Sequence, residues 1–200
     1  MTATRPLFAL ALFAGLAGCI SLGEEPPARL LTLAATDSAP AGPGGPVAPG
    51  TAITIMMPLV PAKLQTTRVP VQASATEIAY VKDAHWVEPP NRLFRRLLGE
   101  VIAARTGRAV LDPRQFAADP GLRLGGQLSE FGVDGEGRAA VVQFDAEAMG
   151  PAGLRTRRFI ARMPLARIDG QSVGPALNRA ANDLAGQVAD WLKDDPPTRP

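Results

Sequence analysis

Histidine, tyrosine and cysteine each occur only once in this 200-residue sequence. A single histidine, His85, excludes a metal site built from several histidines, and a single thiol excludes a disulfide within the chain. The sequence also lacks the glycine–lysine phosphate loop of nucleotide hydrolases and the Gly-x-Ser-x-Gly turn that exposes a nucleophilic serine. A Ser-His-Asp triad would have to recruit His85, which we expect to satisfy a local hydrogen bond instead. We therefore predict a protein that is not an enzyme, with no catalytic residues, no cofactor and no metal.

A strong charge of either sign is also missing. The chain carries 21 basic and 19 acidic side chains, a formal net charge of +2. Such a balance gives no general electrostatic attraction to nucleic acid, so we expect no nucleic-acid partner. Apolar runs are short: the first, from Pro6 to Gly18, falls below the roughly 20 residues that span a bilayer, and no later run is longer.

That first apolar run ends in Leu16-Ala17-Gly18-Cys19, with Arg5 before it. A positive residue, a short apolar stretch, and small residues before a cysteine are typical of a bacterial lipoprotein signal. We predict that residues 1–18 are a signal peptide cleaved between Gly18 and Cys19, and that the Cys19 thiol carries a diacylglycerol. A plain cleaved signal, or an apolar tail with an incidental cysteine, are the alternatives. Because no aspartate follows Cys19, the signal resembles those of lipoproteins sorted to the outer membrane.

The rest of the chain predicts one domain. Residues 19–29 are polar and contain two prolines, as in a tether, and residues 196–200 are a proline-rich flexible tail. Between them we place a single α+β domain at 30–195. Within it, residues 35–50 hold four prolines, four glycines and no large side chain except Val47, so they predict a mobile loop.

Apolar alternation and turn residues predict strands, and helical periodicity predicts two helices. Leu93, Leu97 and Val101 recur at helical spacing after Pro89-Pro90, and Gly107 should end this helix. Gly174-Pro175 should open a second amphipathic helix that ends near Lys193. The expected fold is a mostly antiparallel sheet with both helices packed on one face. Its strands are expected at 51–57, 69–73, 77–81, 109–111, 122–131, 138–149 and 154–163, and a further one could lie at 29–33.

Two groups of charged side chains could serve as sites. Asp145 and Glu147 fall on one face of a strand, where paired carboxylates could perform acid–base chemistry or could be ordinary surface charges. Four arginines lie on the next strand, and they could pair across the sheet or contact lipid headgroups. Their alternation places two on each face of that strand: Arg155, Arg157, Arg158 and Arg162.

The order of these features, together with Trp86-Val87-Glu88-Pro89-Pro90, resembles the ABC-type transport auxiliary lipoproteins, the PqiC-like family. Members show a lipobox, an early aromatic-x-Leu strand, a Leu-Pro-rich segment, and a Trp-Ala-Glu-Pro-Leu-like motif that opens a helix. Trp86, Glu88 and Pro89 match that motif, while Val87 and Pro90 depart from it conservatively. Residues 30–33 lack the usual tyrosine, and Met57-Pro58-Leu59-Val60-Pro61 matches only approximately.

The resemblance implies a non-enzymatic, lipid-anchored component on the periplasmic face of the outer membrane. Its partners would be the MCE-domain protein, permease and ATPase of a system that moves lipid or other hydrophobic compounds, and it could also form a homo-oligomer. Trp86 could anchor such a partner, or it could pack the helix onto the sheet. Two alternatives are a structural or assembly-chaperone lipoprotein of the envelope and a lipid hydrolase that uses Asp145 and Glu147.

Overall fold

The computed structural model describes residues 29–38, 47–48, 50–114 and 121–193. Several predicted features lie outside the described residues: the signal peptide with Gly18 and Cys19, nearly all of the tether, and the tail. So does most of the predicted loop at 35–50.

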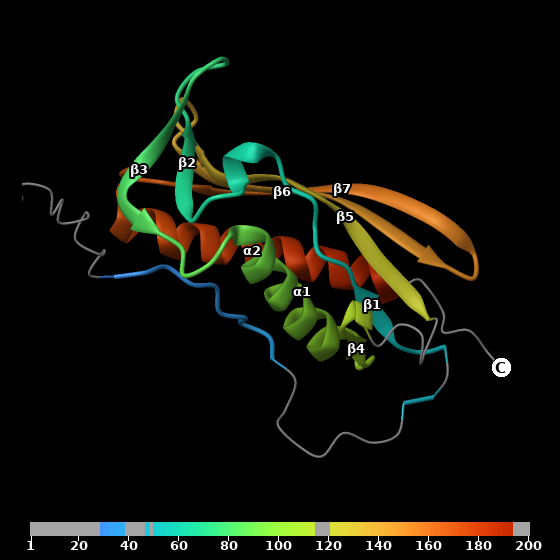
Figure 1. Cartoon of the computed structure of the whole chain (residues 1–200). Helices are drawn as coiled ribbons and strands as arrows, with labels where there is room; N and C mark the ends of the chain where they lie inside the picture. Colours follow the sequence, from blue (N-terminus) through green and yellow to red (C-terminus); the bar gives the residue numbers. More distant parts are fainter. Residues whose placement is uncertain (1–28, 39–46, 49, 115–120, 194–200) are drawn as a thin grey trace, which may run out of the picture.

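The described chain forms seven strands, two α-helices and a short 3-10 helix (Figure 1). The helices are α1 (Pro90–Thr106) and α2 (Gly170–Lys193), and the 3-10 helix is η1 (Ala62–Leu64). The strands are β1 (Ile53–Ile55), β2 (Arg68–Gln72), β3 (Ile78–His85), β4 (Val110–Leu111), β5 (Leu122–Asp134), β6 (Ala139–Gly150) and β7 (Gly153–Pro164). This is an α+β fold, as predicted.

The sheet is mixed, and the prediction of a mostly antiparallel sheet is wrong. The meander β5–β6–β7 is antiparallel, as the turn residues indicate, and so is the pair β2–β3. However, β1 pairs in parallel with both β4 and β5, and β2 also runs parallel to β5. In all three parallel pairs the two strands are separated in the sequence by α1, and such long crossover connections allow parallel pairing.

Strand β5 joins the antiparallel strands β6 and β7 to the rest of the sheet. Along one edge it pairs with β6, while along the other its first residues pair with β1 and its last with β2. Within β5, Gly126 has a φ of 129°, and an added Cβ there would sit 2.0 Å from the carbonyl oxygen of Asp145. Only glycine tolerates both this φ and this close approach of two backbones.

We therefore predict that Gly126→Ala destabilises the fold by roughly 2–3 kcal/mol or more, because backbone strain adds to a clash with an immovable carbonyl. Gly99→Ala is the matched control: Gly99 lies inside α1, and its nearest neighbour would be a Val110 methyl group at 3.6 Å. Alanine should be neutral or stabilising there, since glycine weakens a helix interior. Urea unfolding of the two variants measures the difference, and equal midpoints would show that Gly126 is not under this constraint.

Helix α1 matches its prediction closely. Pro89 precedes the first turn, Pro90 occupies it, and Gly107 ends the helix at φ 68° with its N–H bonded to the Ala103 carbonyl. Helix α2, by contrast, begins at Gly170, four residues before the predicted start. The carboxylate of Asp169 accepts the N–H of Ser172 at 2.8 Å and so caps the helix, while Pro175 lies within it.

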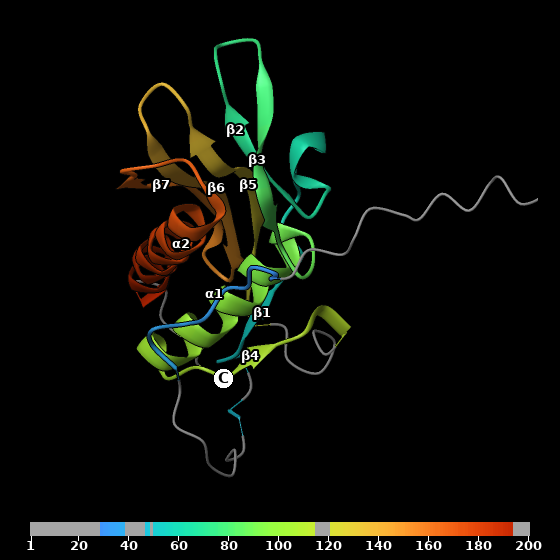
Figure 2. The same ribbon diagram turned by 90° about the vertical axis from the view of Figure 1, so that its left-hand side faces the viewer.

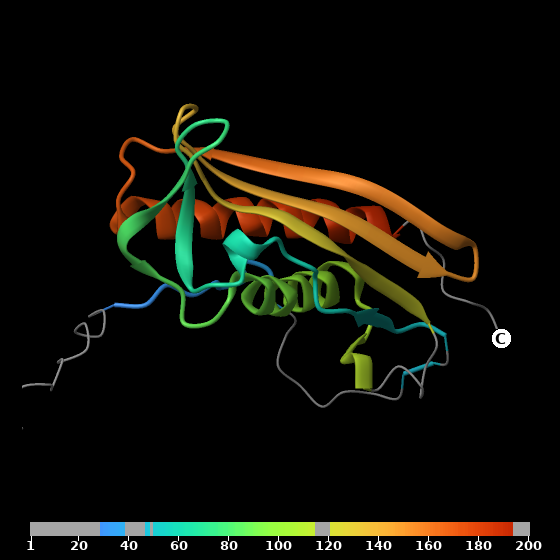
Figure 3. The ribbon, with the colours of Figure 1, turned by 45° about the horizontal axis from the view of Figure 1, so that its top comes forward.

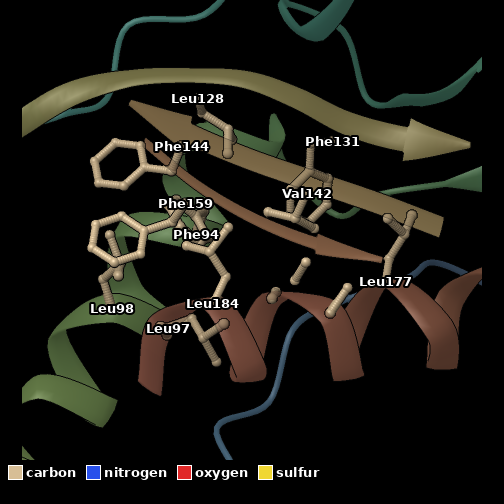
Figure 4. Packing of buried hydrophobic residues seen from close by; sticks show 14 of the residues in the cluster. Phe94, Leu97, Leu98, Leu128, Phe131, Val142, Phe144, Phe159, Leu177 and Leu184 are labelled. Carbon is tan, nitrogen blue, oxygen red and sulfur yellow. The ribbon is translucent and has the colours of Figure 1, made fainter. Parts of the chain in front are cut away.

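Both helices lie on the same face of the sheet, and α2 runs along β6 and β7 (Figures 1 and 2). The core between helices and sheet is aromatic at its centre (Figure 4). Phe94 of α1 lies edge-on to Phe144 of β6 at 5.4 Å between ring centroids, and it contacts Phe131 of β5 at 6.4 Å. Leucines of α2, including Leu177 and Leu184, close the core from below the sheet.

Residues 29–38 form a third layer, which we call the strap. It runs along the two helices on the side away from the sheet (Figure 1). The possible strand at 29–33 is reduced there to one parallel bridge, Leu31 to Trp86. Residues 35–38, expected in the mobile loop, belong to the strap instead. Its side chains alternate, with Leu31, Leu33 and Ala35 packed against the core.

Candidate functional site

The Trp86 motif lies where the strap, the sheet and α1 meet. Trp86 is 1% exposed, and its ring lies edge-on to Phe131 with 5.4 Å between centroids. Its backbone N–H donates to the Thr67 carbonyl at 2.7 Å. Within the described chain, the indole Nε1 has no hydrogen-bond partner. This burial favours the packing interpretation of Trp86 over the partner-anchor interpretation.

The remaining motif residues shape the start of α1. Pro89 holds an extended backbone at the N-cap, and Glu88 forms an ion pair with Arg96 in the second turn of the helix at 2.7 Å. An acidic side chain beside the first turn of a helix, paired with a base further along, stabilises the helix modestly. His85, just before the motif, accepts the N–H of Leu31 through its carbonyl oxygen, but its Nδ1 has no partner among the described residues. The local hydrogen bond expected for His85 is therefore not found at Nδ1 among the described residues, and the bond that its carbonyl accepts comes from Leu31, a residue distant in the sequence.

Two side-chain amides of α2 bond the backbone N–H and C=O groups of the strap, as a neighbouring strand would. Asn182 of α2, only 7% exposed, accepts the N–H of Thr36 at 2.8 Å and donates to the Ala34 carbonyl at 2.9 Å. One turn earlier, Asn178 accepts the N–H of Ala34 at 2.9 Å. At the far end of the strap, Asp37 pairs with Arg105 of α1 at 2.6 Å, which raises the pKa of that guanidinium.

Sequence reasoning missed this arrangement. The signal was present in the alternating apolar residues of 31–35 and in two asparagines, spaced by four, beside the apolar face of an amphipathic helix. Because a buried amide must find hydrogen-bond partners, such an asparagine within an apolar face indicates a segment packed against the helix.

We predict that Asn182→Ala costs roughly 1–3 kcal/mol, since it removes its bonds to Thr36 and Ala34 and leaves backbone groups of the strap unpaired. Faster amide hydrogen exchange should be confined to residues 34–36, with β5–β7 unchanged. Gln187→Ala is the control, because Gln187 is exposed and its side chain bonds the Asp183 carboxylate within the same helix. Strap exchange as slow as in the parent chain would show that the apolar contacts alone hold it.

A hollow of about 850 Å³ opens beside α1, on the side of β1 and β4. Its charges are mixed: Arg95 pairs with Asp112 at 3.3 Å, and Arg114 also binds that carboxylate. The hydrogen bonds from Arg114 lower the pKa of Asp112 to about 2. Apolar side chains of β1 and β4 and three arginines of α1 line the hollow, together with residues that flank these elements: Ile55, Val110, Leu111, Arg92, Arg95, Arg96, Met57, Glu88 and Asp112.

Asp145 and Glu147 do face the same side of β6, the side without helices, but their surroundings differ. Asp145 binds Arg158 of β7 and accepts the hydroxyl of Ser129 at 2.5 Å. Burial acts to raise the pKa of Asp145, yet the hydrogen bonds from Arg158 and Ser129 outweigh it and the pKa is lowered. A general acid needs a raised pKa, so Asp145 is unsuited to that role near neutral pH. Glu147 is exposed, opposite Thr156.

Asp145 gives the fold a predictable acid dependence. Because its pKa is lower in the folded state than its ordinary 3.8, its stabilisation is present above pH 3.8 and is lost as the pH falls through the folded-state value. We expect Asp145→Asn to be less stable than the parent chain at neutral pH by at most about 1 kcal/mol, and this difference to shrink as the pH falls below 3.8. Denaturant midpoints measured at several pH values check this, and a constant difference would contradict it.

Pairing with an acid of the neighbouring strand is confirmed for Arg158, which binds Asp145 of β6, while Arg162 binds Asp134 of β5, one strand further away. The other two lie on the face toward α2, as the alternation predicts. There the Arg155 guanidinium stacks 4.8 Å from the ring centroid of Trp191, and that of Arg157 lies 5.0 Å from Phe159.

Two negative findings apply to the described ranges alone. No three histidine, cysteine, aspartate or glutamate residues there are grouped so that they could hold a metal ion. Neither α1 nor α2 is both long enough and apolar enough to cross a membrane.

Comparison with known proteins gives a family and a shared fold. The model of a family described as ABC-type transport auxiliary lipoprotein component matches residues 31–189. No curated protein sequence matches the chain. Among solved structures, protein XCC0632 from Xanthomonas campestris, of family DUF330, superposes with a TM-score of 0.63 at 17% identity, covering 83% of this chain and 94% of its own.

An uncharacterized protein of known crystal structure gives the same TM-score of 0.63 at 15% identity, over 74% of this chain and 94% of its own. A dodecamer of a PelC variant from Paraburkholderia phytofirmans reaches a TM-score of only 0.36 at 16% identity, over 76% of this chain and 92% of its own, too low to indicate a shared fold.

Proposed function

The chain belongs to the family of ABC-type transport auxiliary lipoprotein components, and from this membership we propose that it is a non-catalytic, outer-membrane-anchored periplasmic partner of an MCE-type transport system for lipid or other hydrophobic compounds. The observation that carries the proposal is the extent of the family match, which runs from the strap to the last turns of α2. The described domain is therefore the family's domain.

The carboxylates support a role without chemistry. The pair considered for a hydrolytic site, Asp145 and Glu147, is divided between an ion pair and an exposed position. The shifted pKa values of the described aspartates are all lowered, which keeps them ionised at neutral pH rather than ready to donate a proton: Asp112, Asp134, Asp145, Asp169 and Asp190.

The strap supports close attachment to a membrane. If Cys19 carries lipid, ten residue steps separate it from Arg29, and an extended chain of that length reaches about 35 Å. Because the strap is bound along α2 from Ala34 to Thr36, the helix layer would stay near the bilayer. The β6–β7 turn lies at the opposite end of the described domain from the blue start of the strap (Figure 3), and it would point toward a partner.

Affinity purification of the tagged full chain from detergent-solubilised envelopes tests the proposal. We expect an MCE-domain protein, a permease and an ATPase to be recovered, and an unrelated outer-membrane lipoprotein with the same tag to recover none of them. Recovery of envelope assembly factors alone would support the structural or chaperone alternative. Density-gradient separation of inner and outer membranes tests the location, and co-migration with the inner membrane would contradict it.

A further inference from the structure

The strap lies along one row of residues in α2, which we call the seat. Its members recur every fourth residue, so they lie above one another on the same side of the helix: Gly174, Asn178, Asn182 and Gly186. The two asparagines bond the strap backbone at Ala34 and Thr36. A glycine stands at each end of the row, and the row as a whole fits a single extended segment.

The glycines of the seat make room for the two ends of the strap. A Cβ added at Gly174 would sit 2.7 Å from Cδ2 of Leu31. At the other end, a Cβ added at Gly186 would sit 2.7 Å from Nη1 of Arg105, the side chain that binds the Asp37 carboxylate of the strap. Because glycine weakens a helix interior, both positions favour seating of the strap over the stability of α2 itself.

The contacts of the strap are of a kind that opens locally. Its inward side chains, Leu31, Leu33 and Ala35, are only partly buried. The ion pair of Asp37 with Arg105 is 40% and 36% exposed, so water screens it. Beneath the strap, α1 and α2 pack directly on each other and on the sheet. A segment with few buried apolar contacts can open while the domain beneath it remains folded.

Two buried polar atoms lie in the residues that Leu31 bridges. The N–H of Leu31 donates to the His85 carbonyl at 2.7 Å, and its carbonyl accepts the N–H of Val87 at 2.9 Å. Next to these bonds, Nδ1 of His85 and Nε1 of Trp86 are buried without a hydrogen-bond partner among the described residues. An unpaired buried polar atom costs free energy relative to a hydrated one. Entry of water at this end of the strap would therefore offset part of the contacts that opening removes.

From these contacts we propose that the strap is a releasable clasp, whose residues 29–38 leave the seat on α2 while the rest of the domain stays folded. The consequence for the membrane rests on the proposed lipid anchor at Cys19. With the strap seated, ten residue steps separate Cys19 from Arg29, whereas β1 begins 34 steps away, at Ile53. Release would lengthen the greatest reach of the anchor from about 35 Å to about 115 Å.

Native-state hydrogen exchange of the full chain in mild detergent tests the release itself. Four N–H groups bond across the boundary of the strap: those of Leu31, Ala34, Thr36 and Val87. We expect all four to open at least about a hundredfold more often than the β5–β7 amides. Low urea should hardly change their opening, because release exposes little surface. Opening of these four only together with β5–β7 would show that the strap leaves solely on global unfolding, and would overturn the proposal.

Gly186→Ala tests the seat, because the added methyl group displaces the flexible end of Arg105 and not a backbone atom. Exchange at Thr36 should become at least about fivefold faster, while the urea midpoint stays equal or rises, since alanine favours a helix. Gly99→Ala, the same change in α1 where there is room, should leave strap exchange unchanged. Unchanged exchange at Thr36 in Gly186→Ala, or a fall in its urea midpoint large enough to explain the faster exchange, would overturn the role of the seat.

The change in reach is tested with Thr36→Cys/Asn182→Cys in the lipidated chain on phosphatidylglycerol vesicles. The parent side-chain oxygens are 3.1 Å apart, so a disulfide there would lock the strap on α2. Energy transfer from a dye at Ala152, in the β6–β7 turn, to labelled headgroups should fall when the disulfide is reduced. Equal transfer in both states would overturn the change in reach. A chain that binds no vesicles would refute the lipid anchor of the proposed function, and hydrogen exchange would still decide the release.

Discussion

Replacing Cys19 with serine is expected to remove essentially all of the protein from the membrane fraction, or to leave it as an unprocessed precursor. The signal processing that the Leu16–Cys19 segment predicts requires the thiol, because the diacylglycerol is attached through sulfur. Burying acyl chains contributes about 0.8 kcal/mol per methylene, and two chains are needed for stable anchoring. Neither described helix is long and apolar enough to cross a bilayer.

Ultracentrifugal fractionation of cells and intact-mass measurement of the purified protein check this expectation. Ser21→Ala is the matched control, since it changes a hydroxyl two residues away and should leave lipidation and membrane recovery unchanged. Normal membrane recovery of Cys19→Ser, or a parent protein with an unmodified amino terminus, would refute the lipid anchor and with it the proposed location. The fold of the domain would be unaffected by that outcome.

Trp86→Ala is expected to lower the free energy of unfolding by roughly 3–5 kcal/mol, because it leaves a large cavity beneath the strap and removes the edge contact with Phe131. Trp86→Phe should cost less, about 1–2 kcal/mol, since it keeps an aromatic ring in the core and deletes only part of the volume. The lost N–H forms no hydrogen bond within the described chain, so its removal adds no penalty.

Denaturant unfolding measures both variants, and affinity purification from envelopes is run in parallel. If Trp86 acts only through packing, Trp86→Phe should recover the same partners as the parent chain. A stable Trp86→Phe variant that recovers none of them would restore the partner-anchor interpretation. The strap gives a second readout. In Trp86→Ala its bridge to residue 86 should loosen, so amide hydrogen exchange at Leu31 should be faster than in the parent chain.

The parts of the fold that sequence reasoning predicts correctly depend on short-range physics. The ends of α1 follow from Pro90, which suits a first helical turn, and from Gly107, which takes the left-handed conformation at φ 68°. The β5–β6–β7 meander follows from alternating apolar residues separated by glycine-rich turns. In each case the residues that decide the structure lie within a few positions of it.

The features that sequence reasoning misses depend on contacts between distant segments. Proline suits a first turn, so the sequence places the start of α2 at Gly174-Pro175, but the Asp169 carboxylate caps the helix earlier and Gly170 packs against the β3 backbone at Asp83. The strap is too short to be ordered by itself, and the amides of α2 hold it in place together with the core beneath it.

The sequence alone therefore determined the family and the elements whose ends are set locally, and it predicts a lipoprotein signal. Tertiary structure alone decided that the sheet is mixed, that Trp86 is buried, that Asp145 is bound by Arg158, and that β7 has β6 as its one partner strand among the described residues. The physical reason is that strand pairing, burial and ionic contacts are interactions of residues that can lie far apart in the chain, as Thr36 and Asn182 do. A local sequence pattern does not specify which distant segment will provide the second partner of such a contact.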